Sequence, residues 1–369
     1  MMSNLLFKSS RLMVKVSLSW LILSLLVACG RAAAPPPSPT PLPLADELIF
    51  YNWTDYFPQS VLDDFTAEYG VPVKYVFFDS QEEAMDSLRA GGVYDVMVLE
   101  NQFVPAMVDE GLLAEIDFRN VLNYNNVASN FRNLAYDPEN LYTVPHTWGS
   151  TGLVVRTDLA QGPISSWSDL WNPAYAGRVA MRSGGTREPI GLALQYLGYS
   201  INSEDPAELE AALEVLLAWQ QNGFVYIGSA VDELVAVLQE KEAVMVLGWG
   251  ADVLVAREAN PAIEYVLPTE GGMMWGDNFV IPASSPNKYT AELFINFALR
   301  PEQGAAIVQE LYLPTANGAA LELIDPALRD DPAVYPPDEA LQNAEVLLPL
   351  SPAGEELHAD IWGRFEAAQ

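Results

Sequence analysis

The sequence is poor in cysteine, histidine and basic residues. Its 369 residues include one cysteine and two histidines, and 18 lysines and arginines stand against 49 aspartates and glutamates. One cysteine excludes an intrachain disulfide and any site built from several cysteine ligands, and two histidines disfavour a histidine-rich metal site. The formal net charge of −31 excludes nucleic acid as the main partner, because phosphate backbones are bound by clustered lysine and arginine.

The sequence does contain enough apolar material for a large core. Half of the residues are hydrophobic and 18% are charged, which is typical of a folded globular protein. At about 100–200 residues per domain, the length indicates two domains or one large one. We therefore expect an acidic folded body with two lobes.

The first residues have the composition of a secretory signal. Lys8, Arg11 and Lys15 precede the apolar run Val16–Val27, and no acidic residue occurs among them. A spanning helix needs about 20 apolar residues, so this shorter run favours a signal peptide over a retained anchor. We predict a signal over residues 1–28, whose removal would change the net charge from −31 to −34.

A cysteine and a proline-rich stretch follow the signal. Leu26-Val27-Ala28-Cys29 resembles the lipobox of bacterial lipoproteins, in which the cysteine is lipidated and becomes the first residue of the mature chain. The proline-rich residues 29–45 predict an extended polyproline II tether. The expected location is the extracytoplasmic face of the cell membrane, in the periplasm or at the cell surface, with a lipid on Cys29 as the anchor.

The body alternates predicted strands and helices. Strands are predicted at Glu47–Trp53, Val71–Phe78, Tyr94–Leu99 and Ala243–Trp249. Helices are predicted to begin at caps provided by Ser60, Ser80 and Asp205. Such alternation is typical of an α/β fold with mostly parallel sheets.

Tryptophans and aspartates recur together near strand ends. The three pairs are Trp53 with Asp55, Trp249 with Asp252, and Trp275 with Asp277. In α/β sheets, ligands bind beyond the carboxyl ends of the strands. A single pair could be a core tryptophan and a helix cap, and Asp252 could cap a helix over Val253–Ala259. Three pairs favour a site.

Several indoles with converging carboxylates suit an organic cation. Aromatic faces attract ammonium groups and cover methylenes, and carboxylates bind the charged ends through strong hydrogen bonds. An acid pair could alternatively serve a glycosidase. The sequence contains no calcium-loop, nucleophile-elbow, phosphate-loop or zinc-protease motif. Binding is therefore favoured over catalysis, and no cofactor is expected.

Longer motifs point to a family. They are Tyr51-Asn52-Trp53-Thr54-Asp55-Tyr56, Ser166-Trp167-Ser168-Asp169-Leu170-Trp171, Gly248-Trp249-Gly250-Ala251-Asp252-Val253, Glu270-Gly271-Gly272, Asn296-Phe297, Leu299-Arg300-Pro301 and Tyr335-Pro336-Pro337. In this order they resemble the bacterial polyamine-binding proteins, the spermidine/putrescine-binding components of ABC transporters. The resemblance implies a two-lobed type II periplasmic-binding-protein fold, with mostly parallel mixed sheets and a hinge of crossing segments.

The resemblance also implies a division into lobes. Lobe 1 would consist of residues 46–146 and 277–315, and lobe 2 of residues 147–276 and 316–369. Crossings are expected near Tyr142–Gly149, near Trp275–Pro282 and after Pro314, which makes His146 a hinge or lobe-edge residue.

The ligand-binding residues implied by the resemblance are Trp53, Thr54, Tyr56, Glu188, Ser229, Trp249, Asp252, Trp275 and Asp277. Asp277 and Asp252 would hold one ammonium and Glu188 the other, with the aromatic rings along the methylenes. Asp252 after Trp249 resembles putrescine-type members.

Other positions depart from the family pattern. Glu100 stands where many members have serine, and Gly185, Leu313 and Leu347 lack expected polar or aromatic groups, which disfavours a triply anchored spermidine. The resulting hypothesis is a monomer that captures putrescine, or spermidine, and delivers it to an ABC permease and its ATPase. The alternatives are another small organic cation or amino compound in the same fold, and a surface glycosidase.

Overall fold

The computed structural model of the protein describes residues 42–182, 186–228, 231–240 and 243–368. The predicted signal, the lipidation site Cys29, nearly all of the tether and the predicted ligand residue Ser229 lie outside these ranges. No helix in the described part of the chain has both the length and the apolar character needed to cross a membrane. The residues from Leu44 onward form a single unit.

A ten-stranded sheet runs through this unit. Its order is β2-β1-β3-β9-β4-β7-β5-β6, with β10 paired to β9 and β8 paired to β4. The strands are β1 (Leu48–Trp53), β2 (Val73–Phe78), β3 (Val96–Glu100), β4 (Val144–Arg156), β5 (Val179–Arg182), β6 (Val225–Ile227), β7 (Met245–Trp249), β8 (Ile263–Val266), β9 (Met273–Val280) and β10 (Glu345–Val346). β1 is parallel to β2 and β3, and β5 is parallel to β6 and β7. The central strands β4 and β9 are antiparallel to each other.

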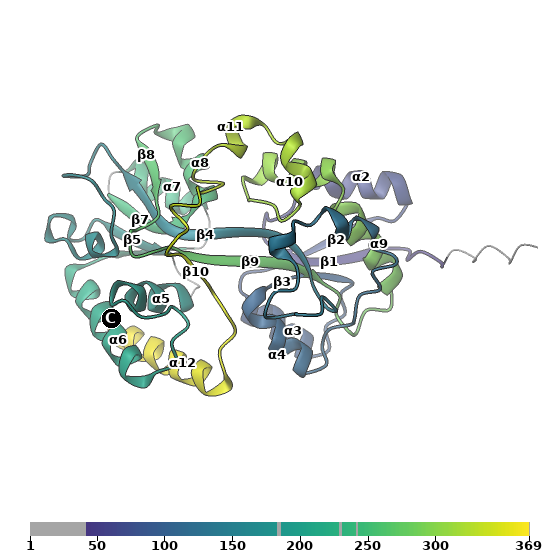
Figure 1. Ribbon diagram of the computed structural model, residues 1–369, viewed down its shortest axis with the longest axis horizontal. Coiled ribbons are helices and arrows are strands. Elements are labelled where there is room, and N and C mark those ends of the chain that lie inside the picture. The colour runs from purple at the N-terminus through teal and green to yellow at the C-terminus, as the bar shows by residue number, and fades with distance from the viewer. Residues whose placement is uncertain (1–41, 183–185, 229–230, 241–242, 369) are drawn as a thin grey trace, which may run out of the picture. The chain divides into compact units, whose positions relative to one another are not determined.

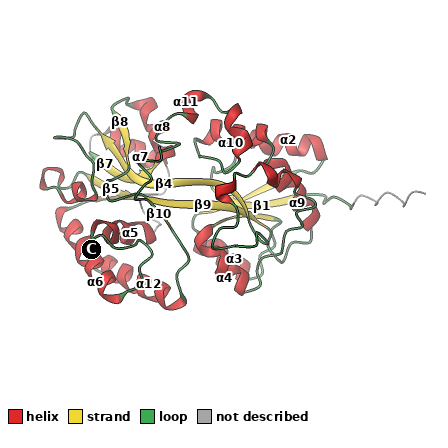
Figure 2. Cartoon of the chain, viewed as in Figure 1, coloured by secondary structure: helices red, strands yellow, loops and turns green. Residues whose placement is uncertain are grey.

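Helices lie on both sides of the sheet (Figure 2). They are α2 (Gln59–Tyr69), α3 (Gln81–Arg89), α4 (Val104–Asp109), α5 (Arg187–Tyr196), α6 (Pro206–Asn222), α7 (Val231–Gln239), α8 (Gly250–Ala259), α9 (Lys288–Ala298), α10 (Pro301–Leu311), α11 (Pro326–Arg329) and α12 (Pro352–Glu366). Short 3-10 helices are η1 (Asn101–Phe103), η2 (Leu122–Asn126), η3 (Ser129–Phe131), η4 (Trp167–Trp171), η5 (Pro173–Tyr175) and η6 (Gly318–Leu323). The predicted α/β fold class is confirmed.

Two of the three predicted helix caps are present. The side chain of Ser80 accepts a backbone hydrogen bond in the first turn of α3, and Asp205 does the same for α6. The predicted cap at Ser60 is wrong. Pro58 takes the extended cap conformation, and Ser60 lies inside α2, where its hydroxyl donates a 2.6 Å hydrogen bond to Glu310.

β4 and β9 run between the two ends of the molecule (Figure 1), and each contributes residues to two different hydrophobic cores. On β4, Val144 belongs to a core with β1 and α9, whereas Leu153 belongs to a core with α5 and α6. On β9, Phe279 and Met273 divide between the same two cores. We call the end with β1–β3 lobe 1 and the end with β5–β8 lobe 2. Both strands thus cross from one lobe to the other.

The chain after α10 returns to the crossing strands. The backbone N–H of Trp148 donates to the carbonyl of Pro314 at 3.1 Å, and Thr147 pairs with Thr315. Further on, Ala320 and Ile324 pack against α10. The predicted lobe boundaries at 146/147, 276/277 and 315/316 stay predictions.

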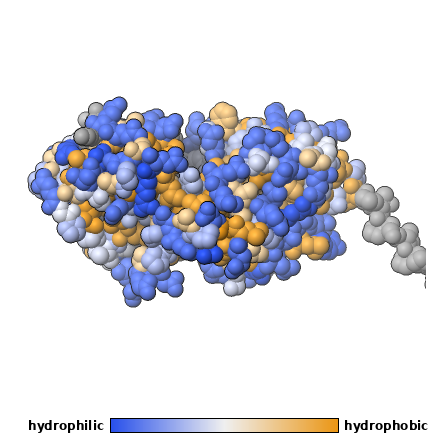
Figure 3. Space-filling model, turned by 90° about the horizontal axis from the view of Figure 1, so that it is seen from above, coloured by the Kyte–Doolittle hydropathy of each residue, from blue (hydrophilic) through white to orange (hydrophobic). Residues whose placement is uncertain are grey.

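The surface is mainly hydrophilic on the face seen in Figure 3, with hydrophobic residues gathered near the middle of the view. Among the described residues, five carboxylates are buried instead of solvated: Asp95, Asp137, Asp252, Asp277 and Glu292.

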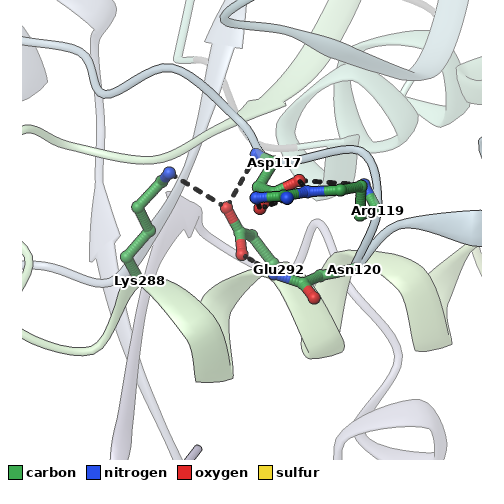
Figure 4. A network of polar contacts seen from close by, with 5 residues as sticks. All are labelled: Asp117, Arg119, Asn120, Lys288 and Glu292. Carbon is green, nitrogen blue, oxygen red and sulfur yellow. Dashed lines mark hydrogen bonds and ion pairs between the residues drawn. The ribbon is translucent and has the colours of Figure 1, made fainter. Parts of the chain in front are cut away.

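The network around Glu292 shows how one of these buried acids is satisfied (Figure 4). The Glu292 carboxylate on α9 accepts from the Asp117 backbone N–H at 2.8 Å and the Asn120 amide at 2.7 Å, and it pairs with Lys288 at 3.2 Å. Arg119 pairs with Asp117 beside it. Glu292 thereby fixes the loop over residues 117–120 on α9.

Candidate functional site

The predicted site gathers where the strands cross. Directly opposed residues of paired strands share a face, so Asp277 and Trp275 of β9 lie on the same face as Thr147 and Thr151 of β4. A cavity of about 550 Å³ adjoins the crossing strands, and its lining includes Trp148, Trp275 and Asp277 but not Glu100, Glu188 or Trp249.

Gly149 allows the indole of Trp275 to lie across β4. A Cβ atom at Gly149 would stand 2.3 Å from Cζ2 of Trp275, far inside the usual contact distance between carbons. The glycine is therefore part of the aromatic wall, because any larger residue would displace the ring.

Asp277 is buried with only half of its carboxylate satisfied. The side chain is 3% exposed, and Oδ2 accepts a 2.7 Å hydrogen bond from the Tyr56 hydroxyl. Oδ1 is buried with no hydrogen-bond partner. Burial raises the pKa of Asp277 to about 6. A buried acceptor without a hydrogen bond is unfavourable in free energy. A donor from outside the described chain would therefore stabilise this oxygen.

Glu100 lies opposite Asp277. The two residues are Cα partners in the β3–β9 ladder. Burial, and then the charge of Asp277, raise the pKa of Glu100 to about 8. Its Oε2 accepts a 2.7 Å hydrogen bond from the Gln102 amide. The sequence marked Glu100 as a departure from the family pattern but did not include it among the predicted ligand residues.

The lobe 2 side supplies Glu188 and Trp249. Glu188, in the first turn of α5, accepts a hydrogen bond from the Thr151 hydroxyl and a 3.1 Å bond from the Trp249 indole N–H. The Trp249 and Trp275 rings meet edge to face, with centroids 5.9 Å apart. Two indoles and one carboxylate of the prediction are thus brought together.

Asp252 has a different environment. Its Oδ2 pairs with Arg182 at 2.9 Å and accepts the Trp249 backbone N–H at 2.9 Å. The Arg182 guanidinium also lies 4.3 Å from the Trp249 ring centroid. Burial raises the pKa of Asp252, against the opposing charge of Arg182. Asp252 therefore has a cation of the protein as its partner, and its sharing of a ligand ammonium with Asp277 stays a prediction.

The remaining predicted residues lie at the end of β1. Trp53 is half-buried, and its ring lies 4.8 Å from that of Phe78. Thr54 is exposed. No contact recorded among the described residues joins Trp53 to the indoles of lobe 2, so its role as a ligand wall stays a prediction.

Sequence reasoning missed three residues of this cluster. Thr147 and Thr151 follow the two-residue period of a strand, which could have identified them once the crossing strand was placed. Arg182 had no such signal, because an arginine at the end of a short strand is ordinary in sequence. Its position over Trp249 depends on tertiary packing.

Two α/β lobes joined by crossing strands, with acids and indoles gathered at the crossing, define the class of hinged solute-binding proteins. The chain belongs to the family of bacterial extracellular solute-binding proteins, whose model matches residues 60–336. The predicted family is confirmed. Because the family consists of solute-binding proteins, binding rather than catalysis is also confirmed, and the glycosidase alternative is not supported.

Relatives and solved structures agree with this assignment. The chain is 36% identical to the spermidine/putrescine-binding periplasmic protein of Escherichia coli, over 81% of this chain and 85% of that protein. It is 29% identical to the putrescine/agmatine-binding protein of Pseudomonas aeruginosa, over 94% and 98%. A putative spermidine/putrescine ABC transporter structure from Listeria monocytogenes superposes with a TM-score of 0.82 at 29% identity, covering 88% of this chain and all of that one.

Proposed function

We propose that the protein captures a polyamine outside the cytoplasm, with putrescine favoured over spermidine, and delivers it to an ABC transporter permease driven by its ATPase. The observation that carries this proposal is Asp277, a buried acid whose Oδ1 has no partner in the described chain. An ammonium donor would satisfy that oxygen with a charge-assisted hydrogen bond.

The other predicted residues extend the site from Asp277. Glu188 would receive the second ammonium, and Trp249, Trp275, Trp53 and Tyr56 would cover the methylenes between the two charges. The names of the relatives, which bind putrescine with spermidine or with agmatine, support this ligand class. Closure of the lobes is favoured by the ligand, because both lobes contribute groups to it.

The localisation in the proposal has two parts. Membership of an extracellular solute-binding family supports an extracytoplasmic protein. The lipid anchor at Cys29 and a monomeric state rest on the sequence, and labelling with a radioactive fatty acid, abolished in Cys29→Ala, would test the anchor.

A calorimetric titration of the purified protein with putrescine, cadaverine, spermidine and spermine tests the ligand class. Thermal unfolding supplies a second readout, since ligand at 100 times its Kd adds about 2.7 kcal/mol to the free energy of unfolding. We expect putrescine to bind more tightly than spermidine. If neither putrescine nor spermidine binds at millimolar concentration, the proposed polyamine function is wrong.

A further inference from the structure

Two carboxylates face each other across the β3–β9 ladder. Glu100 and Asp277 are directly opposed, which places their side chains on one face with Cβ atoms about 4.5–5.5 Å apart. Among the described residues, no lysine, arginine or histidine forms an ion pair with either of them. This separates them from Asp252, which pairs with Arg182, and from Glu292, which pairs with Lys288.

The hydrogen bonds leave one oxygen of each carboxylate available. Tyr56 donates to Oδ2 of Asp277, and Gln102 donates to Oε2 of Glu100. Oδ1 of Asp277 is buried without a partner. A primary ammonium has three N–H donors and could therefore donate to both carboxylates at once.

We infer that Glu100 is a second anchor of the ligand, which with Asp277 forms a two-carboxylate seat for one primary ammonium group. The inference rests on the proposed function, since it names a further binding residue of the same site. Two carboxylates so close together, one buried and one half-buried, resist simultaneous ionisation, and the bound cation removes that conflict. Binding at neutral pH should therefore release a proton, which agrees with the raised pKa of Glu100.

A contact between the lobes positions Glu100. Arg187, the first residue of α5, donates to the Gln102 side-chain oxygen at 3.3 Å, and the Gln102 amide donates to Glu100. Glu188 is the next residue after Arg187. The helix that carries the acid of lobe 2 is thus linked to the seat in lobe 1, with Gln102 as a positioning residue.

Calorimetric titration of putrescine into the full chain and into Glu100→Gln tests the seat. Each titration is run at pH 7 and pH 9 in two buffers of different ionisation enthalpy, which counts the protons released. At pH 7 the wild type should release up to about one proton more than Glu100→Gln does, and at pH 9, where Glu100 is already ionised, that difference should almost vanish. Glu100→Gln should bind at least about tenfold more weakly at pH 9. Glu82→Gln is the matched control, because Glu82 is exposed and acts on Glu100 only through its charge, and its affinity should stay within about twofold.

The outcomes separate this inference from the proposed function. Failure of the wild type to bind any polyamine overturns both. If the wild type binds and Glu100→Gln binds equally well or more tightly, only the seat is wrong. If Glu100→Gln does not fold, the wild-type proton count decides, since no release at pH 7 contradicts the seat. Glu100→Asp then adds a second variant, expected to bind more weakly while keeping a proton release.

Discussion

Asp252 and Asp277 are both buried aspartates beside a tryptophan, yet their hydrogen-bond and ion-pair partners differ. In lobe 2, Asp252 is paired with Arg182 and with a backbone N–H. In lobe 1, one oxygen of the Asp277 carboxylate accepts a hydrogen bond from a hydroxyl and the other has no partner. A second carboxylate, that of Glu100, lies opposite. A buried charge is tolerated when it is paired and hydrogen-bonded. Asp252 therefore has its partner within the protein, whereas Asp277 needs a partner from outside.

The largest expected effect concerns the paired acid. Arg182→Met should lower the free energy of unfolding by about 3–5 kcal/mol, because it leaves Asp252 buried without its cation. Urea unfolding measures the loss, and adding Asp252→Asn should restore part of it. Arg119→Met is the matched control, since Arg119 pairs with Asp117 but is 89% exposed, and should cost only about 0–1 kcal/mol. If Arg182→Met loses less free energy of unfolding than Arg119→Met, Asp252 does not depend on Arg182 and the contrast with Asp277 is wrong.

The unpaired acid should affect ligand affinity instead. Asp277→Asn removes the charge that a bound ammonium would contact, and should weaken putrescine binding by about 2–5 kcal/mol, on the order of 30- to 4,000-fold. Calorimetry measures the affinity, and urea unfolding should show no loss of stability. Asp117→Asn changes a half-buried acid of the loop beside Glu292, outside the site, and should leave the affinity unchanged. Normal binding by Asp277→Asn would remove Asp277 from the site.

Ionisation of Glu100 should lower the free energy of unfolding of the ligand-free protein as the pH rises. Its pKa is raised from 4.5 to about 8 in the folded protein, so the folded state holds a proton that the unfolded state has lost between these values. Stability therefore falls as the pH rises across this window. Glu100→Gln should raise the Tm at pH 8 by at least about 2 °C and change it little at pH 4, where the wild-type carboxyl is protonated in both states. An equal shift at both pH values would point to packing rather than charge.

The sequence predicted the class of fold better than the balance of charges in the site. Strand and helix periodicity, with the order of the motifs, predicted the α/β architecture. The motifs also grouped Trp275 and Asp277, which both lie on β9, with Trp249 at the end of β7, whose ring meets that of Trp275. The sequence could not show which acid is paired with a cation of the protein itself, because Arg182 reaches Asp252 from a strand 70 residues away in the chain. The opposition of Glu100 and Asp277 depends on strand register, which local sequence does not specify.

The smallest expected effect comes from the hydroxyl on Asp277. Tyr56→Phe removes the 2.7 Å hydrogen bond to Oδ2, which holds the pKa of Asp277 below the value that burial alone would give. The pKa should rise further in the variant, so more of the carboxyl is protonated near pH 6.5 and a cation must displace that proton. Putrescine affinity should fall by about 0.5–1.5 kcal/mol at that pH and by less at pH 9, where Asp277 is ionised in both proteins. Calorimetry at the two pH values measures the difference, and Tyr69→Phe, at the half-buried last residue of α2, is the control. A loss independent of pH would mean that Tyr56 acts on the ligand by contact alone and that the charge of Asp277 does not depend on it.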